Sequence, residues 1–256
     1  MGLYLLKKGP LPFDEKALGK DGGKYVETGD SRKVEYFVFG NLEPESKVII
    51  CIHGSGPEAV SEIDFNEKCC IELGLKGIAI SMPGYGYTDM KPGRQAIDWP
   101  KEDLAAVLKK EEVEKLMIMG HSQGTVHAMA AAYYYPERCE GFGLNAPLLP
   151  SKVSKEEGIV SAVGSDSLPN TATIQKFYMA WYFAVMHLML VKMSPWLPLK
   201  AMKMASTTVT FKIMRDTLKR AVIRGSVGGT YETAHDVCYD WGFDPRNIKN
   251  GNICIW

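Results

Sequence analysis

The sequence lacks an excess of charge of either sign. Its 256 residues include 30 Lys and Arg and 30 Asp and Glu, so the formal net charge is zero. Proteins that bind nucleic acid usually carry a basic excess or a basic stripe, and neither is present, so we expect no nucleic-acid partner. Hydrophobic residues make up 46% of the chain and charged residues 23%, which is typical of a globular protein and argues against disorder.

Long apolar runs are also absent. The longest covers residues 177–191 (FYMAWYFAVMHLMLV), falls short of the ~20 residues that cross a bilayer, and contains His187. The apolar start at residues 1–6 is followed by Lys7, Lys8 and Pro10, so it is too short for a signal peptide. We therefore expect no transmembrane segment. The run at 177–191 indicates a buried or groove-lining helix.

Zinc, redox and dinucleotide motifs are missing as well. The six cysteines include the adjacent Cys69 and Cys70, and no pair has the C-x-x-C spacing. Cys51 and Cys254 fall in apolar, strand-like runs, so the pattern predicts buried free thiols in a reducing compartment and thus a cytoplasmic location. No G-x-G-x-x-G sequence opens a helix after the first buried strand. The sequence gives no reason to expect a metal or a cofactor.

What the sequence does contain is an alternation of short apolar runs and helical patterns. Buried strands are expected at residues 47–52, 77–80, 116–119 and, more weakly, 141–144, and helices at 58–73, 101–110 and 123–135. Such alternation predicts βαβ units and a mostly parallel sheet covered on both faces, the α/β fold class. Residues 25–26 and 34–39 are expected to form an antiparallel pair ahead of these units.

The character of the chain changes after residue 150. Residues 151–171 are polar and loop-like, and residues 172–222 are helical and rich in Met and aromatic side chains. This stretch predicts an insertion lying over the sheet. A flexible joint at 225–229 (GSVGG), a helix near 230–241 and a final apolar run complete the chain. The expected parts are therefore residues 1–150, an insertion at 151–224 and a return at 225–256.

One motif carries chemistry. Residues 120–124 (GHSQG) fit G-x-S-x-G, follow the apolar run KLMIM and open a helix. A tight strand-to-helix turn holds such a serine in strained backbone, and the flanking glycines let neighbouring backbone pass closely. We interpret Ser122 as a nucleophile. An ordinary glycine-rich turn is the alternative.

A second glycine motif follows the first buried strand. Hydrolysis of an acyl bond needs donors where negative charge develops on the carbonyl oxygen. One N–H comes from the residue after the nucleophile, here Gln123, and another from a loop beside the turn. Residues 53–56 (HGSG) are suited to supply it, from Ser55 or its neighbour Gly54.

Three segments together resemble the α/β-hydrolase family: residues 49–56 (IICIHGSG), 81–89 (SMPGYGYTD) and 117–125 (MIMGHSQGT). The resemblance covers roughly residues 25–256. It implies an eight-stranded sheet, a helical cap inserted after the sixth strand, and a serine nucleophile. Residues 1–150 would be the N-terminal part of the core and 151–224 the cap. The turn at 83–86 would be structural, and Asp89 a loop or cap residue.

The resemblance breaks down at the acid and the base. In the family the acid follows the seventh strand and the histidine follows the eighth. Residues 253–256 (ICIW) resemble the seventh strand and the sequence stops there, while Asp240 and Asp244 come too early to match the acid. We therefore expect a sheet that lacks the last strand and helices. Activity should be impaired, because losing triad members costs on the order of 10⁶ in turnover.

None of the five histidines is an evident substitute for the base. His53 and His121 belong to the glycine motifs, where the backbone matters more than the ring. For His127 we expect a core or surface role. His187 could hang over a pocket, although a buried structural histidine is the preferred interpretation. His235 and its neighbour project to different sides of a helix, so they form no base–acid pair.

The insertion indicates the substrate. Met179, Tyr182, Met186 and His187 would belong to an adaptable apolar pocket, unless they only pack the insertion onto the sheet. The first hypothesis is a serine hydrolase of the esterase or lipase class acting on a small hydrophobic substrate. An epoxide-type mechanism is disfavoured, since those relatives carry an aspartate at the nucleophile position. The alternative is a non-catalytic ligand-binding or interaction protein on the same fold.

Overall fold

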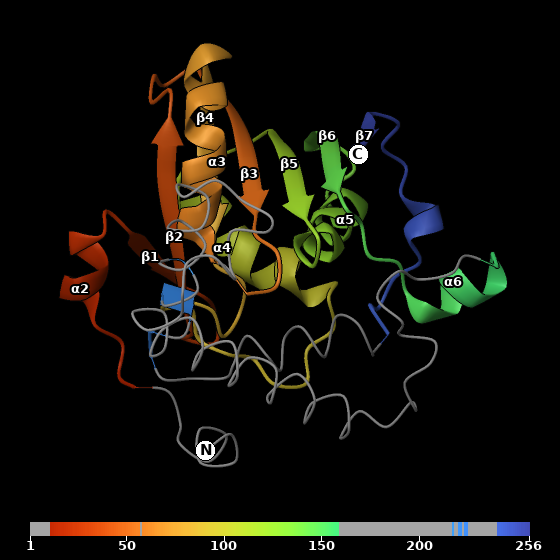
Figure 1. Ribbon diagram of the computed structural model, residues 1–256, viewed down its shortest axis with the longest axis horizontal. Coiled ribbons are helices and arrows are strands. Elements are labelled where there is room, and N and C mark those ends of the chain that lie inside the picture. The colour runs from red at the N-terminus through yellow and green to blue at the C-terminus, as the bar shows by residue number, and fades with distance from the viewer. Residues whose placement is uncertain (1–10, 57, 159–216, 218–219, 222, 225–239) are drawn as a thin grey trace, which may run out of the picture.

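A seven-stranded sheet forms the centre of the protein (Figure 1). The computed structural model describes residues 11–56, 58–158, 217, 220, 221, 223, 224 and 240–256. The strands are β1 (Lys24–Glu27), β2 (Lys33–Gly40), β3 (Lys47–Ile52), β4 (Leu75–Ile80), β5 (Leu116–His121), β6 (Cys139–Asn145) and β7 (Ile253–Ile255). Their order in the sheet is β1-β2-β4-β3-β5-β6-β7. β2 pairs antiparallel with β1 and β4, and the remaining pairs are parallel. The prediction of a mostly parallel sheet with an antiparallel start is confirmed.

Helices cover both faces of this sheet. In Figure 1, α3 lies in front of the sheet, and α4 and α5 lie behind it. The helical elements are α2 (Glu15–Lys20), α3 (Ala59–Glu72), the π-helical turn η1 (Pro100–Leu104), α4 (Ala105–Lys110), α5 (Gly124–Tyr134), α6 (Ser151–Glu156) and the 3₁₀ turn η3 (Pro245–Asn247). In the part of the chain that the structure describes, no helix is both long and apolar enough to cross a bilayer.

The alternation of side chains along β3 explains why two cores form. Ile50 and Ile52 are fully buried in the cluster that contains the α4 and α5 side chains, whereas Cys51 is buried in the cluster that contains Ala59 and Cys70 of α3. Successive strand residues point to opposite faces, so an uninterrupted apolar run such as KVIICI fits only a sheet covered on both sides.

Three helical segments differ from the sequence expectation. The helix expected at 101–110 starts as a π turn at Pro100, whose ring nitrogen has no N–H to donate, and becomes α-helical at Ala105. Residues 151–156 form α6 instead of a loop, with good helix formers such as Lys152 and Glu156 in it. α2 was not expected. Its N-cap is Asp14, whose side chain accepts a hydrogen bond from the Ala17 N–H.

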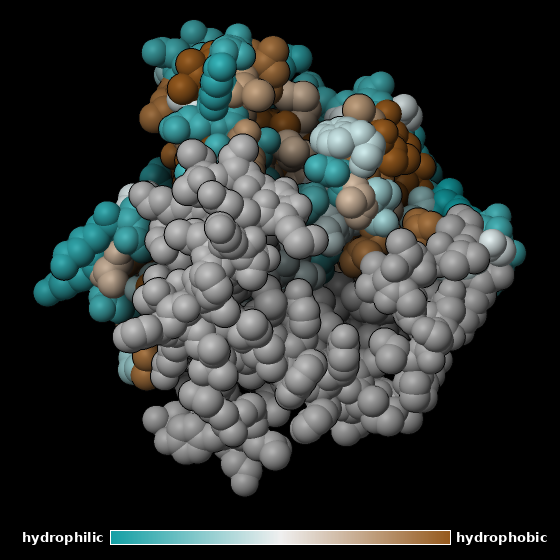
Figure 2. Space-filling view, in the orientation of Figure 1, coloured by the Kyte–Doolittle hydropathy of each residue, from teal (hydrophilic) through white to brown (hydrophobic). Residues whose placement is uncertain are grey.

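β7 lies at one edge of the sheet and is exposed. Ile253, Ile255 and Trp256 have relative exposures of 47%, 63% and 57%. In Figure 2, hydrophobic residues reach the surface around the position that β7 takes in Figure 1. The expectation of buried thiols is wrong for Cys254 and for Cys69, which are exposed, because β7 is an edge strand and Cys69 lies on the outer side of α3.

Candidate active site

Ser122 occupies the turn between β5 and α5. Its φ is +50°, a left-handed conformation that side chains other than glycine rarely adopt. Holding a non-glycine residue in this conformation costs about 1–3 kcal/mol of folding free energy, so it persists only where the surrounding structure enforces it. The Ser122 N–H donates to the carbonyl oxygen of Asn145 at the end of β6, at 2.8 Å. The predicted strained turn is confirmed, and the serine is partly exposed.

The two glycines of the motif are required by close backbone contacts. A Cβ on Gly120 would lie 2.3 Å from the carbonyl oxygen of Gly124. A Cβ on Gly124 would lie 2.3 Å from the carbonyl oxygen of Ile52 and 2.6 Å from that of His53. Any larger residue would push α5 away from β3 and β5. The spacing G-x-S-x-G is therefore a packing requirement of this turn.

The loop after β3 passes directly beside the serine. A Cβ on Gly54 would lie 3.2 Å from Cβ of Ser122 and 2.9 Å from the ring of His121. Ser55, the next residue, is exposed, and its Oγ donates to Oε1 of Gln123 at 2.8 Å. The three residues expected to form an oxyanion hole, Gly54, Ser55 and Gln123, are thus gathered around Ser122.

Gln123 also stands at a favourable electrostatic position. It is the N-cap of α5, and its side chain is fully buried. The N-terminus of a helix carries partial positive charge from N–H groups aligned with the axis. An oxyanion at Ser122 would therefore lie next to the positive end of α5. Thr125 reinforces this first turn, since its Oγ1 donates to the Ser122 carbonyl oxygen at 2.5 Å and accepts from the Leu148 N–H at 3.1 Å.

Tyr85 is a site residue that the sequence reasoning missed. Its hydroxyl donates to Oε1 of Gln123 at 3.3 Å, and its ring packs edge-on against His53 with a centroid distance of 4.8 Å. The turn at 83–86 was predicted to be structural, and Gly84 and Gly86 do adopt positive φ values there. The sequence feature that could have identified Tyr85 is its position as an aromatic residue between these two glycines. The turn directs its side chain toward Gln123.

The His53 side chain forms hydrogen bonds with backbone groups, which agrees with the structural role expected for it. Nε2 accepts from the Met82 N–H at 3.0 Å, so Nδ1 carries the proton and donates to the Gly54 carbonyl oxygen at 2.8 Å. Burial lowers the pKa of His53 to about 4, so the ring is neutral near pH 7. His53 therefore ties the loops after β3 and β4 together and is not available as a base.

The other described histidines are not bonded to the serine either. His121 precedes Ser122 and is exposed at the surface. His127 is fully buried in α5, where Nε2 lies 3.0 Å from Arg94 and the ring stacks edge-on against Trp99. Within the described residues, Ser122 Oγ makes no hydrogen bond to an imidazole or a carboxylate. His187 and His235 lie outside the described residues.

The remaining sequence-predicted acids have structural partners. Asp89 accepts from the Lys33 N–H at 2.8 Å and from Arg224 at 2.7 Å, which agrees with its expected loop role. Asp244 caps η3 and binds Arg246, which lowers its pKa to about 2. Asp240 accepts from the Gly242 N–H. The pocket residues proposed from the sequence, Met179, Tyr182, Met186 and His187, lie outside the described residues, as does most of the insertion.

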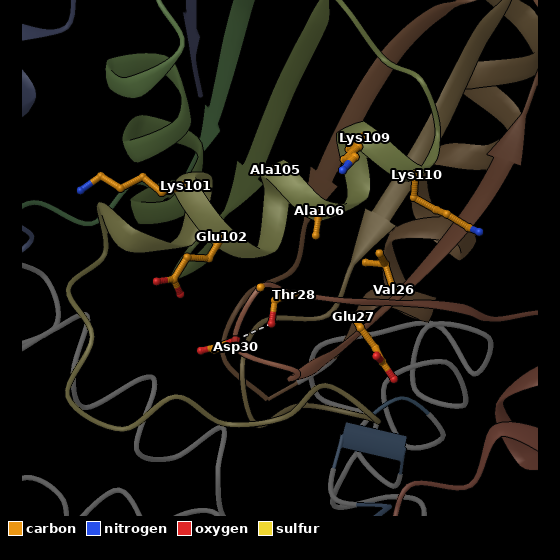
Figure 3. A pocket seen from close by; sticks show the side chains of 11 residues that line it. Val26, Glu27, Thr28, Asp30, Lys101, Glu102, Ala105, Ala106, Lys109 and Lys110 are labelled. Atoms are coloured by element: carbon orange, nitrogen blue, oxygen red, sulfur yellow. Dashed lines mark hydrogen bonds between the residues drawn. The ribbon is translucent and has the colours of Figure 1, made fainter.

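A separate cavity of about 800 Å³ lies between the β1–β2 turn and the η1–α4 helix, and not at the Ser122 turn (Figure 3). Its lining residues are Val26, Glu27, Thr28, Gly29, Asp30, Lys101, Glu102, Ala105, Ala106, Lys109 and Lys110. Acidic and basic side chains are mixed around it, and it contains none of the residues near Ser122. It therefore does not belong to the candidate site.

Comparisons with known proteins extend this description. The sequence model of the family described as "alpha/beta hydrolase fold" matches residues 47–206. A 2-hydroxy-6-oxononadienedioate/2-hydroxy-6-oxononatrienedioate hydrolase from Escherichia coli strain K12 is 24% identical over 119 residues, which make up 45% of this chain and 41% of that enzyme. The match thus spans about two fifths of the length of this curated relative.

Solved structures show the same fold. A carboxylesterase structure from Nitrososphaera gargenis has a TM-score of 0.59 and 16% identity, covering 85% of this chain and 73% of the other. A putative epoxide hydrolase from Klebsiella pneumoniae has a TM-score of 0.56 and 16% identity, covering 89% and 73%. At such identities the likeness concerns the fold alone, since one fold hosts many reactions.

Proposed function

Since this chain belongs to the α/β-hydrolase family, we propose that it is a serine hydrolase that cleaves an ester or related acyl bond of a small hydrophobic substrate. The observation that carries the proposal is the backbone of Ser122, held at φ +50° beside Gly54 and at the N-terminus of α5. In a turn of this kind, the strained backbone exposes the serine hydroxyl so that it can attack a carbonyl carbon.

The chemistry follows from this arrangement. Ser122 Oγ attacks the carbonyl carbon, a C–O bond forms, and the carbonyl π electrons move to oxygen. The backbone N–H groups of Gln123 and Ser55 stabilise that oxyanion, and Gly54 leaves space for it. When the carbonyl re-forms, the ester C–O bond breaks and the alkoxide leaves as the alcohol, taking up the proton that Ser122 lost. Water then adds to the acyl carbon, the bond to Oγ breaks, and the carboxylic acid and the Ser122 hydroxyl are released. Preorganised donors of this type contribute about 10²–10³ each to turnover.

The serine identity of residue 122 selects among the reactions of the family. An epoxide mechanism would require a carboxylate nucleophile, so the fold shared with epoxide hydrolases does not bring that reaction with it. The Escherichia coli relative is named for a 2-hydroxy-6-oxo substrate, and an oxo group is a carbonyl that a serine can attack. We therefore favour a carbonyl-containing substrate. A pocket contributed by residues 151–224, with Met179, Tyr182, Met186 and His187, remains part of the proposal.

The proton of Ser122 needs an acceptor. None of His53, His121 and His127 is bonded to Ser122 Oγ. We therefore propose slow turnover, because no base is bonded to Ser122 within the described part of the chain and a serine hydroxyl is a weak nucleophile without one. This same observation favours the second candidate function, a non-catalytic ligand-binding protein that keeps the fold and the serine turn.

A fluorophosphonate probe tests the proposal. We expect slow covalent labelling of the purified chain, located at Ser122 by mass spectrometry and abolished in Ser122→Ala. Ser31→Ala is the matched control, because Ser31 also has a positive φ, +64°, but lies in the β1–β2 turn. It should leave labelling unchanged. Complete absence of labelling at concentrations that saturate other serine hydrolases would overturn the hydrolase proposal and favour the ligand-binding alternative.

A further inference from the structure

Two fully buried carboxylates share a single arginine near the candidate site. Arg220 Nη1 donates to Glu35 Oε1 at 2.9 Å and to Glu58 Oε2 at 2.8 Å, and Nη2 donates to Glu35 Oε2 at 3.0 Å. Glu35 and Glu58 both have 0% exposure. Arg220 Nε also donates to the partly exposed Asp21 at 3.0 Å. A guanidinium is suited to this, because its planar fork serves two carboxylates at once.

Each carboxylate is bonded in turn to backbone next to the site. Glu58 follows the loop that contains Gly54 and Ser55, and its Oε2 accepts from the Val60 N–H at 3.1 Å, which caps α3. Glu35 reaches the loop after β4. It accepts from the Ser81 hydroxyl at 2.6 Å and from the Tyr87 N–H at 3.1 Å.

The arginine is thus joined to the two loops that hold Gln123. The loop after β3 reaches Gln123 through Ser55, and the loop after β4 reaches it through Tyr85. Ser81 links the two loops again, since its Oγ accepts from the Ala59 N–H at 3.4 Å. Arg220 is therefore connected, through Glu58 and Glu35, to the same pair of loops that place the candidate oxyanion donors beside Ser122.

Neighbours of Arg220 strengthen this attachment. The Gly86 N–H donates to the Ala221 carbonyl oxygen at 3.2 Å. Arg224 Nη1 donates to Asp89 at 2.7 Å and to the Tyr87 carbonyl oxygen at 3.3 Å. The loop after β4 is thus bonded at Gly86, Tyr87 and Asp89 to residues that lie far along the chain.

Close packing leaves this arrangement little freedom. A Cβ on Gly86 would lie 2.5 Å from Glu35 Oε1. The Arg220 guanidinium carbon lies 4.9 Å from the Phe37 ring centroid and 5.5 Å from that of Tyr87. Buried carboxylates without a counter-charge are strongly disfavoured. Burial raises the pKa of Glu58, and the adjacent Arg220 guanidinium opposes this shift by favouring the ionised carboxylate.

We propose that Arg220 is a positioning residue, which fixes the loops after β3 and β4 through Glu58 and Glu35 and thereby sets Ser55 and Gln123 in place beside Ser122. The effect on Ser122 rests on the proposed function. The effect on the loops does not, so the two parts can be tested separately.

The test compares Arg220→Met with Arg246→Met. Arg246 is a matched control, because it also binds three carboxylates, Asp244, Glu156 and Glu157, but is exposed and pairs with none in the loops after β3 and β4. Hydrogen exchange is measured by mass spectrometry for peptides covering residues 54–60 and 82–88. We expect exchange about 10-fold faster in both peptides for Arg220→Met, as for loss of one or two net hydrogen bonds, and no change there for Arg246→Met. Labelling of Ser122 by the fluorophosphonate should slow by a similar factor.

A charge-matched variant separates positioning from simple charge compensation. Arg220→Met leaves two buried carboxylates unpaired and could prevent folding. The triple variant Arg220→Met, Glu35→Gln, Glu58→Gln removes the charges together with the arginine, so it should fold with thermal stability close to wild type. If Arg220 positions the loops, the peptides covering residues 54–60 and 82–88 should still exchange faster in the triple variant than in the wild type. Wild-type exchange in the triple variant, or in a folded Arg220→Met protein, would overturn the proposal. Altered exchange without any labelling of the wild-type chain would refute the hydrolase proposal but support the role of Arg220 in the loops.

Discussion

The Ser55 hydroxyl donates a 2.8 Å hydrogen bond to the side-chain carbonyl of Gln123, the residue that follows the candidate nucleophile. The two residues come from different loops, after β3 and after β5, and both were expected to offer a backbone N–H to the same oxyanion. Their side chains therefore set the spacing between their backbones. Preorganised donors stabilise a developing charge because they need no reorientation during the reaction.

Ser55→Ala should loosen this spacing. Because one hydrogen bond contributes about 0.5–1.5 kcal/mol net, we expect fluorophosphonate labelling of Ser122 to slow by a few-fold to about 10-fold, with little change in the free energy of unfolding, since Ser55 is exposed. The rate of labelling is measured by quenching the reaction at a series of times and determining the intact mass of the protein. Ser46→Ala is the control, because Ser46 Oγ is buried with no hydrogen-bond partner among the described residues. Equal rates for Ser55→Ala and wild type would show that the side-chain bond does not position the loop.

Gly124→Ala should be among the most damaging single substitutions in the core. Its Cβ would meet the carbonyl oxygens of Ile52 and His53 at 2.3 and 2.6 Å, and backbone cannot move aside as a flexible side chain can. We expect a loss of at least about 3 kcal/mol in the free energy of unfolding, at the upper end of overpacking effects. Urea denaturation measures it.

Gly19→Ala provides the contrast. Gly19 lies in α2, and a Cβ there would meet nothing within 4 Å. The same change should therefore stabilise the protein by about 0.5–1 kcal/mol through helix propensity and a less flexible unfolded chain. Similar effects of the two substitutions would contradict the close approach of α5 and β3.

The positions of the strands along the chain and the serine turn could be predicted from the sequence because they depend on local patterns. The run KVIICI fits only a strand buried on both faces, and G-x-S-x-G describes a turn whose backbone contacts lie within a few residues or on the neighbouring strand. α2 and α6 were missed because each has only six residues, and so short a helix has little apolar periodicity.

The connections between loops could not be predicted. Tyr85 and Gln123 are 38 positions apart, and Arg220 and Glu35 are 185 positions apart. A single arginine among many gives no local signal that it pairs with two particular glutamates, because the pairing depends on how the sheet and the loops come together. The burial of Glu35 is equally hidden, since strand β2 offers both polar and apolar side chains to the same core.

The pH dependence of stability should include a contribution from His53. Its pKa is about 4 in the folded protein and about 6.5 in the unfolded chain, because burial disfavours the charged ring. Between these values the unfolded state binds more protons, so stability rises with pH across this window and is lost as the pH falls from 6.5 toward 4. The contribution is at most about 3 kcal/mol, since one pKa unit corresponds to about 1.4 kcal/mol.

Titration of the His53 ring by NMR checks this directly, and urea denaturation at pH 4–8 gives the stability. Replacement by Gln, which also has a donor and an acceptor, should remove the His53 share of the pH dependence between 4 and 6.5. Titration of His53 near pH 6.5 would show that the ring is accessible to solvent. The hydrogen bonds of its ring to the Met82 N–H and the Gly54 carbonyl oxygen would then be contradicted.

The reactivity of the cysteines should report whether β7 is an open edge in solution. Cys254 lies on β7 and Cys69 on the outer side of α3, and both are exposed, whereas Cys51, Cys70 and Cys139 are buried. Burial also raises the pKa of Cys51, Cys70 and Cys139, which lowers their thiolate fraction. Iodoacetamide at pH 8 should therefore modify Cys69 and Cys254 at least about 10-fold faster than the buried three, measured by peptide mass spectrometry. Because Cys69 serves as the internal reference, slow modification of Cys254 alone would mean that another chain covers β7, and dilution of the protein should then restore its reactivity.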